Sequence, residues 1–200
     1  MTDVADLFLH EQVLLLALHD EKGTISDSMF AYAVAGAMVS ELLLRGALRV
    51  EQVKKKKMLA IGDPRPVGVR VLDECLDRVR SAKRRADVAT WIGRLANMKN
   101  LKHRVAERLY LMGVLRKEEG RVLWVFPRVV YPTANPGPEQ RLVDELRTAV
   151  AEDGEVDPRI AILVALTRSS GILGNVVGKK LLKSRKARVE ALASMHDVGG

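Results

Sequence analysis

Cysteine is almost absent from this chain of 200 residues, in which Cys75 is the only one. A single thiol cannot form an internal disulfide, and this favours a reducing compartment. Cys75 also falls on an apolar position of an expected helix. We therefore predict that it is buried and packs as a small apolar side chain.

Apolar runs long enough to span a bilayer are absent too. The strongly apolar stretch 13–18 is far too short for that. Asp3, Asp6 and Glu11 precede it, whereas a signal peptide begins with cations. We therefore expect a cytoplasmic protein, with any membrane contact being peripheral.

Patterns of catalytic and metal-binding residues are also missing. The four histidines do not have the spacing of metal ligands, and no nucleophile elbow or dinucleotide fingerprint is present. The segment 171–180 resembles a phosphate loop, but only three residues separate Gly174 from Gly178 where that motif has four. We predict no enzymatic activity, no metal site and no cofactor.

Positive charge is plentiful but unevenly placed. Residues 51–130 carry 20 cations and 9 anions, whereas residues 1–50 carry 3 and 7, and residues 131–200 carry 10 and 9. The excess of cations that gives the chain its net charge of +8 therefore lies in the middle of the chain. Such a local excess creates a field that attracts phosphate groups.

The middle of the chain also contains the most informative stretch, 99–131. Apolar residues recur at helical spacing from Leu101 to Met112, and Gly113 follows at the position where helices often end. Between them stand the cations Lys99, Lys102 and Arg104. The pattern predicts a helix with one basic side.

A β-hairpin is expected directly after this helix. We predict a first strand at 114–116, a polar turn at 117–121 and a return strand at 122–126 that ends before Pro127. Aromatic residues make up only 4% of the chain, so Trp124 and Phe126 on one short strand are notable. A basic helix followed by an apolar hairpin fits docking on an anionic surface.

Apolar periodicity predicts helices in most of the remaining chain. They cover residues 7–18, 29–44, 71–79, 88–96, 139–151, 157–168, about 171–182 and about 187–195. Asp87 and Asp157 are expected N-caps, the latter with a proline at the first helical position. Trp91 shares a helical face with apolar partners, and we place it in the core.

One segment repeats part of another. Leu, Gly, Leu, Arg and Glu recur at matching positions in 44–51 and 111–118, and both segments predict a helix, a glycine stop and a strand. The first copy would form a second hairpin with a return strand at 58–61. We predict a mainly α fold, a single-domain multi-helix bundle over residues 1–200 with its core at about 7–185. It carries one or two short β-hairpins, one of them protruding and apolar.

Six stretches in this order and spacing resemble the Golgi phosphoprotein 3 family. They are LLLALHDEKG (14–23), GAMVSELLLRGALRVE (36–51), VLDECLDRV (71–79), TWIGRLAN (90–97), RVAERLYLMGVL (104–115) and VLWVF (122–126). The resemblance implies an almost all-helical fold with one protruding hairpin and peripheral binding to phosphatidylinositol 4-phosphate. It also implies, in eukaryotes, retention of glycosyltransferases by their cytosolic tails. A composition rich in Ala, Val and Arg suits a bacterial relative.

The resemblance also suggests which residues bind the membrane. Two arginines of the family's headgroup pocket fall on Lys99 and Lys102, with Arg104 just beyond. The pocket tryptophan falls near Ser26 and a further arginine near Ala35, so we predict weak selectivity for the 4-phosphate. The hairpin that enters the bilayer falls on four residues: Leu123, Trp124, Val125 and Phe126.

Three functions follow from these patterns. The favoured one is a peripheral membrane protein that binds anionic phospholipid or phosphoinositide headgroups, with an adaptor role toward the cytosolic tails of membrane proteins. Use of the apolar hairpin for homo-oligomerisation is a second function, which is compatible with the first. The third is a winged-helix-like nucleic-acid binder. It is disfavoured because such a wing usually has a basic tip.

Overall fold

The computed structural model describes residues 4–18, 29–122 and 126–195. In chain order the helices are η1 (Val4–Asp6), α1 (Leu9–Ala17), α2 (Phe30–Leu44), α3 (Arg70–Arg80), α4 (Val88–Ala96), α5 (Leu101–Leu111), α6 (Gly137–Ala151), α7 (Pro158–Ser169), α8 (Leu173–Val177), α9 (Lys179–Ser184) and α10 (Lys186–Ser194). The strands are β1 (Leu48–Val53), β2 (Lys56–Ile61), β3 (Glu118–Val122) and β4 (Phe126–Val130). The prediction of a mainly α fold with short hairpins is confirmed.

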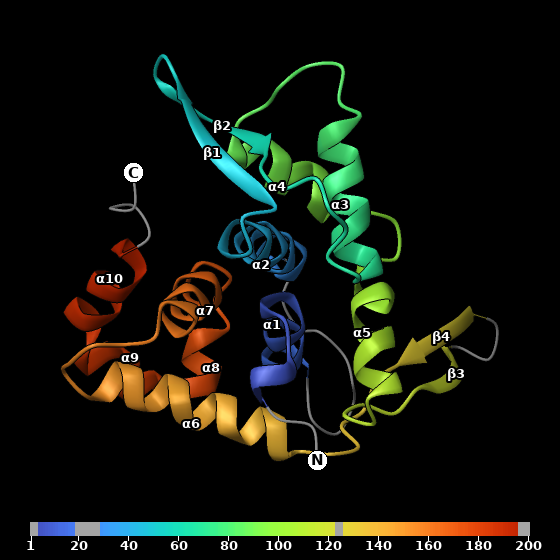
Figure 1. Cartoon of the computed structure of the whole chain (residues 1–200). Coiled ribbons are helices and arrows are strands. Elements are labelled where there is room, and N and C mark those ends of the chain that lie inside the picture. The colour runs from blue at the N-terminus through green and yellow to red at the C-terminus, as the bar shows by residue number, and fades with distance from the viewer. Residues whose placement is uncertain (1–3, 19–28, 123–125, 196–200) are drawn as a thin grey trace.

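Helix α2 lies at the centre of the molecule, where it packs against α1, α4 and α7 (Figure 1). Its small residues allow this close packing. A Cβ atom on Gly36 would lie 2.8 Å from Cδ2 of Leu166 on α7, so any larger residue would require the Leu166 side chain to move. Ala35 is also fully buried. The sequence-based placement of this helix at the core is confirmed.

A buried carboxylate on α2 joins three helices, and the sequence pattern did not reveal it. Glu41 accepts hydrogen bonds from the Leu9 backbone N–H at 3.0 Å, Arg159 Nη2 at 2.9 Å and Arg45 Nε at 2.7 Å. Burial alone would raise the pKa of Glu41, but the bonds from Arg159, Leu9 and Arg45 outweigh it and lower the pKa. Because a buried charge needs such partners, the start of α1 and the start of α7 are fixed to α2.

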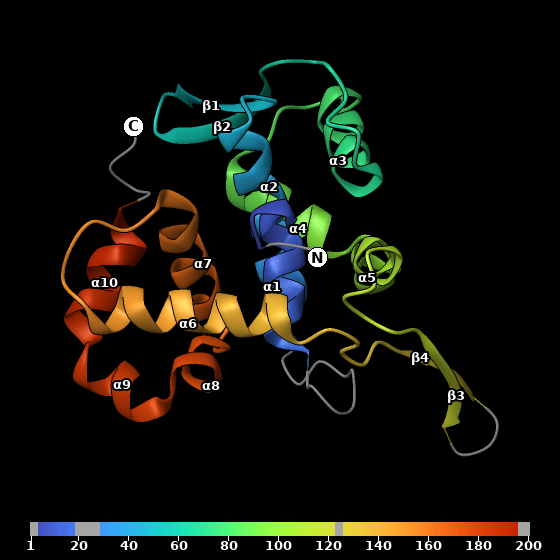
Figure 2. The ribbon, with the colours of Figure 1, turned by 60° about the horizontal axis from the view of Figure 1, so that its bottom comes forward.

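Two separate antiparallel hairpins leave the helical body (Figure 2). In β1–β2 the pairing runs from Leu48 opposite Ile61 to Val53 opposite Lys56. The helix before each hairpin ends close to a left-handed glycine, Gly46 with φ 69° and Gly113 with φ 71°. The predicted helix–glycine–hairpin order is thus confirmed at both places.

Two predictions at the level of single elements are wrong. Strand β3 includes most of the expected polar turn, and Pro127 pairs with Arg121 inside β4 instead of ending a strand. The apolar residues 123–125, expected in the return strand, lie outside the described residues. The helix expected over 171–182 is divided into α8 and α9 at Gly178, whose φ of 93° is incompatible with a continuous helix.

Candidate functional site

Helix α5 is positioned by one buried face. Its four buried residues are Leu101, Val105, Ala106 and Leu109, and the helix packs against α1. The start of the helix has no capping side chain, because Asn100 adopts a left-handed conformation and accepts no bond from the first turn. The positive end of the helix dipole therefore stands beside Lys99 and Lys102, which suits an anion.

The three predicted headgroup cations have different environments. Lys99 is exposed just before α5, and Lys102 in its first turn is half-buried. Arg104 points to α3, where its guanidinium pairs with Glu74 and its side chain keeps only 22% exposure. Arg78 Nη2 shares the same carboxylate at 2.9 Å. Lys99 is therefore the most open of the three cations, while Arg104 serves to join α5 to α3.

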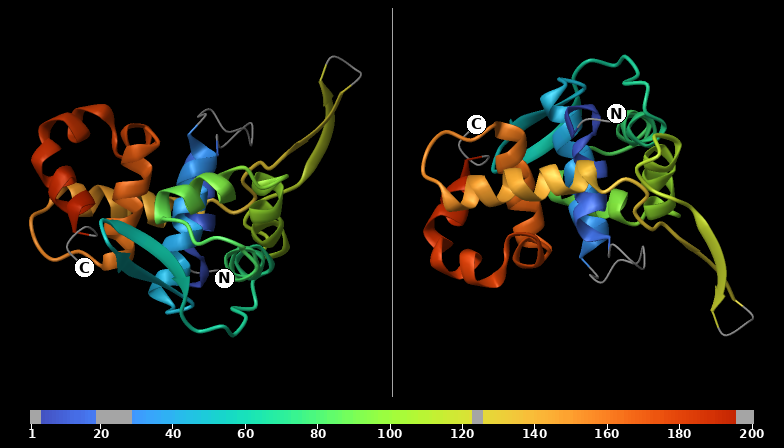
Figure 3. Two further views of the ribbon diagram at one scale, coloured as in Figure 1. Left: turned by 90° about the horizontal axis from the view of Figure 1, so that it is seen from above. Right: turned by 90° about the horizontal axis from the view of Figure 1, so that it is seen from below.

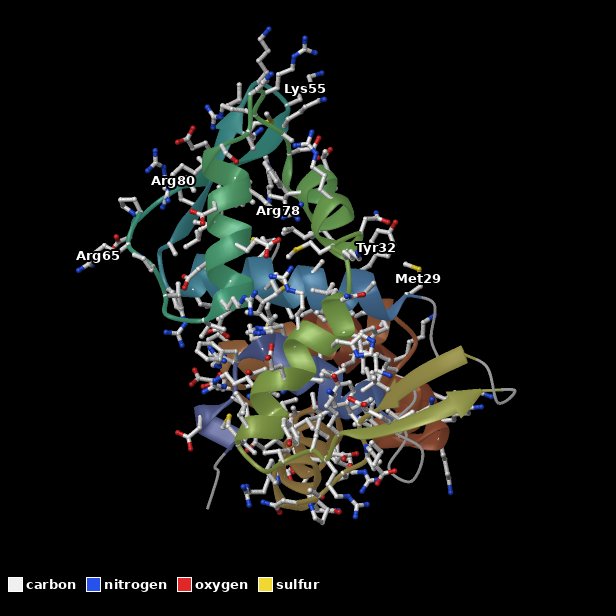
Figure 4. The ribbon with its side chains drawn as sticks, turned by 90° about the vertical axis from the view of Figure 1, so that its right-hand side faces the viewer. Met29, Tyr32, Lys55, Arg65, Arg78 and Arg80 are labelled. Atoms are coloured by element: carbon white, nitrogen blue, oxygen red, sulfur yellow. The ribbon has the colours of Figure 1, made fainter. Side chains whose placement is uncertain are left out.

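Two further residues near this end of α5 were missed by the sequence reasoning. Met29 and Tyr32 lie at the start of α2 and are 46% and 45% exposed, respectively. Figure 4 shows both side chains on one flank of the molecule, between α4 above and the β3–β4 hairpin below. An exposed tyrosine beside a methionine is an amphipathic pair suited to a membrane interface. Their apolar character let them be read as ordinary members of a core helix.

Ser26 and Ala35 stand at the two positions where the family's pocket has a tryptophan and a further arginine. Ser26 lies outside the described residues. Ala35 lies inside the core on α2, with no exposed surface. No cation at position 35 complements Lys99 and Lys102, so the site has fewer charges than the family pattern.

The base of the β3–β4 hairpin is tied to α5. Leu115 and Thr133 form an antiparallel bridge, and the Arg116 backbone N–H donates to the Pro132 carbonyl at 2.8 Å. His103 on α5 contacts Tyr131, which follows β4 directly. These bonds fix where the hairpin leaves the body, and Figure 3 shows it projecting away from the helices.

Of the predicted membrane-inserting residues, Leu123, Trp124 and Val125 lie outside the described residues. Phe126 begins β4 and its backbone pairs with Val122. The role of the four residues as a membrane wedge stays a prediction.

Comparison with known proteins gives one consistent result. Residues 9–199 match the sequence model of Golgi phosphoprotein 3. Vacuolar protein sorting-associated protein 74 of Schizosaccharomyces pombe is 26% identical over 170 residues, which cover 73% of this chain and 50% of that protein. The chain thus spans about half the length of this curated relative. Among the described residues, no helix is long and apolar enough to cross a membrane.

Proposed function

The chain belongs to the Golgi phosphoprotein 3 family, and on that premise we propose that it is a cytoplasmic protein that docks peripherally on anionic membranes. One observation carries the proposal. Helix α5, the exposed pair Met29 and Tyr32, and the protruding β3–β4 hairpin occur on one side of the molecule (Figure 4). The start of α5 is uncapped, and the exposed Lys99 stands just before it. Cations, interfacial side chains and a hairpin with an apolar sequence are together what a lipid surface requires.

Headgroup binding in this proposal is electrostatic. Each cation near an anionic leaflet contributes about 1 kcal/mol, so Lys99 and Lys102 alone give weak attachment. Lysine is a point charge without the forked geometry of arginine, and it attracts phosphate without fixing its orientation. Arg104 contributes through the local field and through its support of α5 by way of Glu74.

The β3–β4 hairpin supplies the apolar part of the proposed membrane contact. Removing Trp124 and Phe126 from water would add roughly 1.5–3 kcal/mol each. Neither contribution is large by itself, and their sum suits reversible docking.

Flotation of the protein with liposomes tests this proposal. We expect flotation with vesicles that contain phosphatidylserine or phosphatidylinositol 4-phosphate and none with phosphatidylcholine alone, with binding weakened by salt because exposed charges are screened. A DNA gel shift in the same buffer addresses the winged-helix alternative. Binding to DNA without binding to any anionic vesicle would refute the proposal.

The adaptor part of the proposal has separate support in an acidic hollow of about 810 Å³ beside α6 and α7. Asp144, Glu152 and Glu155 line it as exposed carboxylates that form no ion pair with another described residue. Gln12 also lines it, is 4% exposed, and leaves its Oε1 without a hydrogen-bond donor among the described residues. Acceptors without donors suit a cationic segment, and cytosolic tails beside membrane spans are rich in Lys and Arg.

Binding of a fluorescent Lys/Arg-rich peptide tests the adaptor part. The variant Glu152→Lys/Glu155→Lys should weaken peptide binding while leaving liposome flotation unchanged. As a control, Glu118→Lys/Glu119→Lys makes the same charge change on β3. Equal loss of peptide binding in both variants would show a general charge effect and no docking in the hollow.

Oligomerisation through the hairpin remains a proposal that is compatible with lipid binding. If the apolar residues of this hairpin are covered by a second copy in solution, gel filtration should show an oligomer that dissociates on replacement of Trp124 by Ala. Lipid binding and self-association then compete for the same residues.

A further inference from the structure

The β1–β2 hairpin and its neighbours carry a large local excess of positive charge. Residues 49–57 and 83–94 contain nine Lys and Arg against two Asp and Glu, a net charge of +7 within a chain of +8. The fold joins these two segments, because the Leu59 backbone N–H donates to the Ala86 carbonyl at 3.1 Å and Met58 forms a bridge with Asp87. We call residues 49–57 and 83–94 the basic hairpin surface.

Most cations of the basic hairpin surface are not neutralised. Glu51, one of the two carboxylates on this surface, pairs with both Arg49 and Arg85. Five exposed cations form no ion pair with any other described residue: Lys54, Lys55, Lys57, Lys83 and Arg84. They gather at the free end of the hairpin and on the adjacent loop, where a polyanion could reach them together.

The other cations labelled in Figure 4, Arg65, Arg78 and Arg80, are each paired with a carboxylate. Arg65 and Arg80, labelled toward the left of Figure 4, bind Asp63 at 2.5 Å and Asp77 at 2.9 Å. Lys55, labelled at the top, has no such partner. The tip of the β1–β2 hairpin therefore presents a cluster of open positive charge.

The turn of this hairpin has an unfavourable backbone for the residues it contains. Val53 pairs with Lys56, so Lys54 and Lys55 alone make the turn, and Lys54 has a φ of 55°. Glycine or asparagine adopts this left-handed conformation more easily than lysine. Gln52 Nε2 donates to the Lys54 carbonyl at 2.8 Å and supports the turn. Non-glycine residues in this conformation cluster at functional sites, which makes Lys54 a candidate for a functional role.

The β1–β2 hairpin borders the side of the molecule that we propose to dock on the membrane. Figure 4 shows β1–β2 at the top and β3–β4 at the right, with Met29 and Tyr32 on the flank between them. On β1 itself Val50 and Val53 are 42% and 41% exposed. Apolar side chains next to lysines match an interface of headgroups and acyl chains.

We propose that the basic hairpin surface is a second contact with the same anionic bilayer, so that the protein docks on two hairpins, one basic and one apolar. This inference rests on the proposed function but uses different residues. A bilayer fits better than nucleic acid, because the tip has lysines and exposed valines but none of the exposed aromatic side chains on which bases stack. The contact is non-specific, with lysines attracted to acidic headgroups of any kind.

A neutralising variant with a matched control tests the proposal. The tip variant Lys54→Gly/Lys55→Gln/Lys57→Gln removes three charges and relieves the strained turn, so the hairpin remains folded. The control Lys179→Gln/Lys180→Gln/Lys183→Gln removes three exposed lysines from α9, which lies away from both hairpins (Figure 1). With phosphatidylserine vesicles at about 0.1 M salt, we expect the tip variant to bind at least ten-fold more weakly and the control to bind nearly as wild type.

A probe on the hairpin reports the contact directly. Lys55→Cys can be labelled selectively with an environment-sensitive dye, because Cys75 is fully buried. We expect a blue shift on addition of phosphatidylserine vesicles, and none for the same dye at Lys180→Cys. If wild type binds and neither the tip variant nor the Lys55 probe responds, the second contact is refuted while the proposed function stands. If wild type binds no anionic vesicle, the proposed function itself fails. Loss of DNA binding in the tip variant with unchanged vesicle binding would assign this surface to nucleic acid.

Discussion

The Tyr131 hydroxyl lies 3.2 Å from Nδ1 of His103, and the two rings are 5.6 Å apart. This contact joins the basic helix α5 to the chain that leaves β4. Burial, with Lys102 and Lys117 nearby, lowers the pKa of His103, so its ring is neutral at pH 7. The docking helix and the apolar hairpin are therefore held together by a hydrogen bond between neutral groups.

Replacing Tyr131 by Phe tests this link. The variant loses the hydrogen bond but keeps the ring, so the free energy of unfolding in urea should fall by about 1 kcal/mol. Amide exchange at Arg116, whose N–H bonds to Pro132, should become faster. Unchanged stability and exchange would mean that the backbone bonds alone hold the hairpin.

The headgroup prediction concerns Lys99 and Lys102. Their joint replacement by Glu should reduce binding to anionic liposomes more than ten-fold, because two attractions become repulsions. Thermal stability should change little, since neither side chain is fully buried. The pair Lys179→Glu/Lys180→Glu provides a control of equal charge, and an equal loss there would remove Lys99 and Lys102 from the site.

Selectivity among phosphoinositides should be poor. Lys99 and Lys102 lack the forked geometry of arginine, and buried Ala35 supplies no third cation. Vesicles matched in total charge but carrying the 3-, 4- or 5-phosphate should bind within about a factor of ten of each other, which is the effect of one interaction of 1.4 kcal/mol. A strong preference for the 4-phosphate would contradict this reasoning.

Trp124 should enter the interface, and its fluorescence can show this. Replacing Trp91 by Phe removes the other tryptophan signal and breaks no hydrogen bond, because the Trp91 Nε1 has no partner among the described residues. In that background we expect a blue shift of Trp124 on addition of anionic vesicles, and Trp124→Ala should weaken binding without unfolding the protein. The absence of a shift together with loss of an oligomer on gel filtration would favour the interface role. The absence of a shift with a large fall in melting temperature would place Trp124 in the core.

Stability should fall below pH 6.5 because of His10. Burial, with Arg108 adding to it and Glu41 opposing it, lowers the pKa of His10 from 6.5 to about 3. Between these values the unfolded chain binds a proton that the folded chain does not, so the stabilisation present above pH 6.5 is lost progressively as the pH falls toward 3. The shift predicts a loss of about 2 kcal/mol between pH 7 and pH 5.

The variant His10→Gln isolates this effect. Its free energy of unfolding in urea should differ less between pH 7 and pH 5 than that of wild type, since its side chain does not titrate. Equal losses in both proteins would show that other groups cause the acid sensitivity.

The sequence by itself determined features that depend on a few adjacent residues. Asp87 caps α4 by accepting the Thr90 N–H at 2.7 Å, and Asp157 caps α7 in the same way through Arg159. Gly113 follows α5 in the left-handed conformation that its position in the pattern predicted. Caps, glycine stops and apolar periodicity act within one or two helical turns, so they are readable without knowledge of the fold.

The register of the β3–β4 hairpin could not be predicted from the local sequence. The polar residues 117–121 have the composition of a turn, but Glu118 pairs with Val130 and Arg121 with Pro127 inside a strand pair. The register is fixed at the base, where Arg116 bonds to Pro132. Contacts between the two ends of the hairpin therefore overrode the local preference for a turn.

Only the tertiary structure decided which charges are open and which are used internally. Arg104 and Lys99 look alike in the sequence, yet Arg104 meets Glu74 from a helix 30 positions earlier while Lys99 stays exposed. Lys54 and Arg84 lie 30 residues apart and come together on one surface through the bond between Leu59 and Ala86. The energy of a charge depends on its neighbours in space and on its exposure to water, and the packing of distant segments sets both.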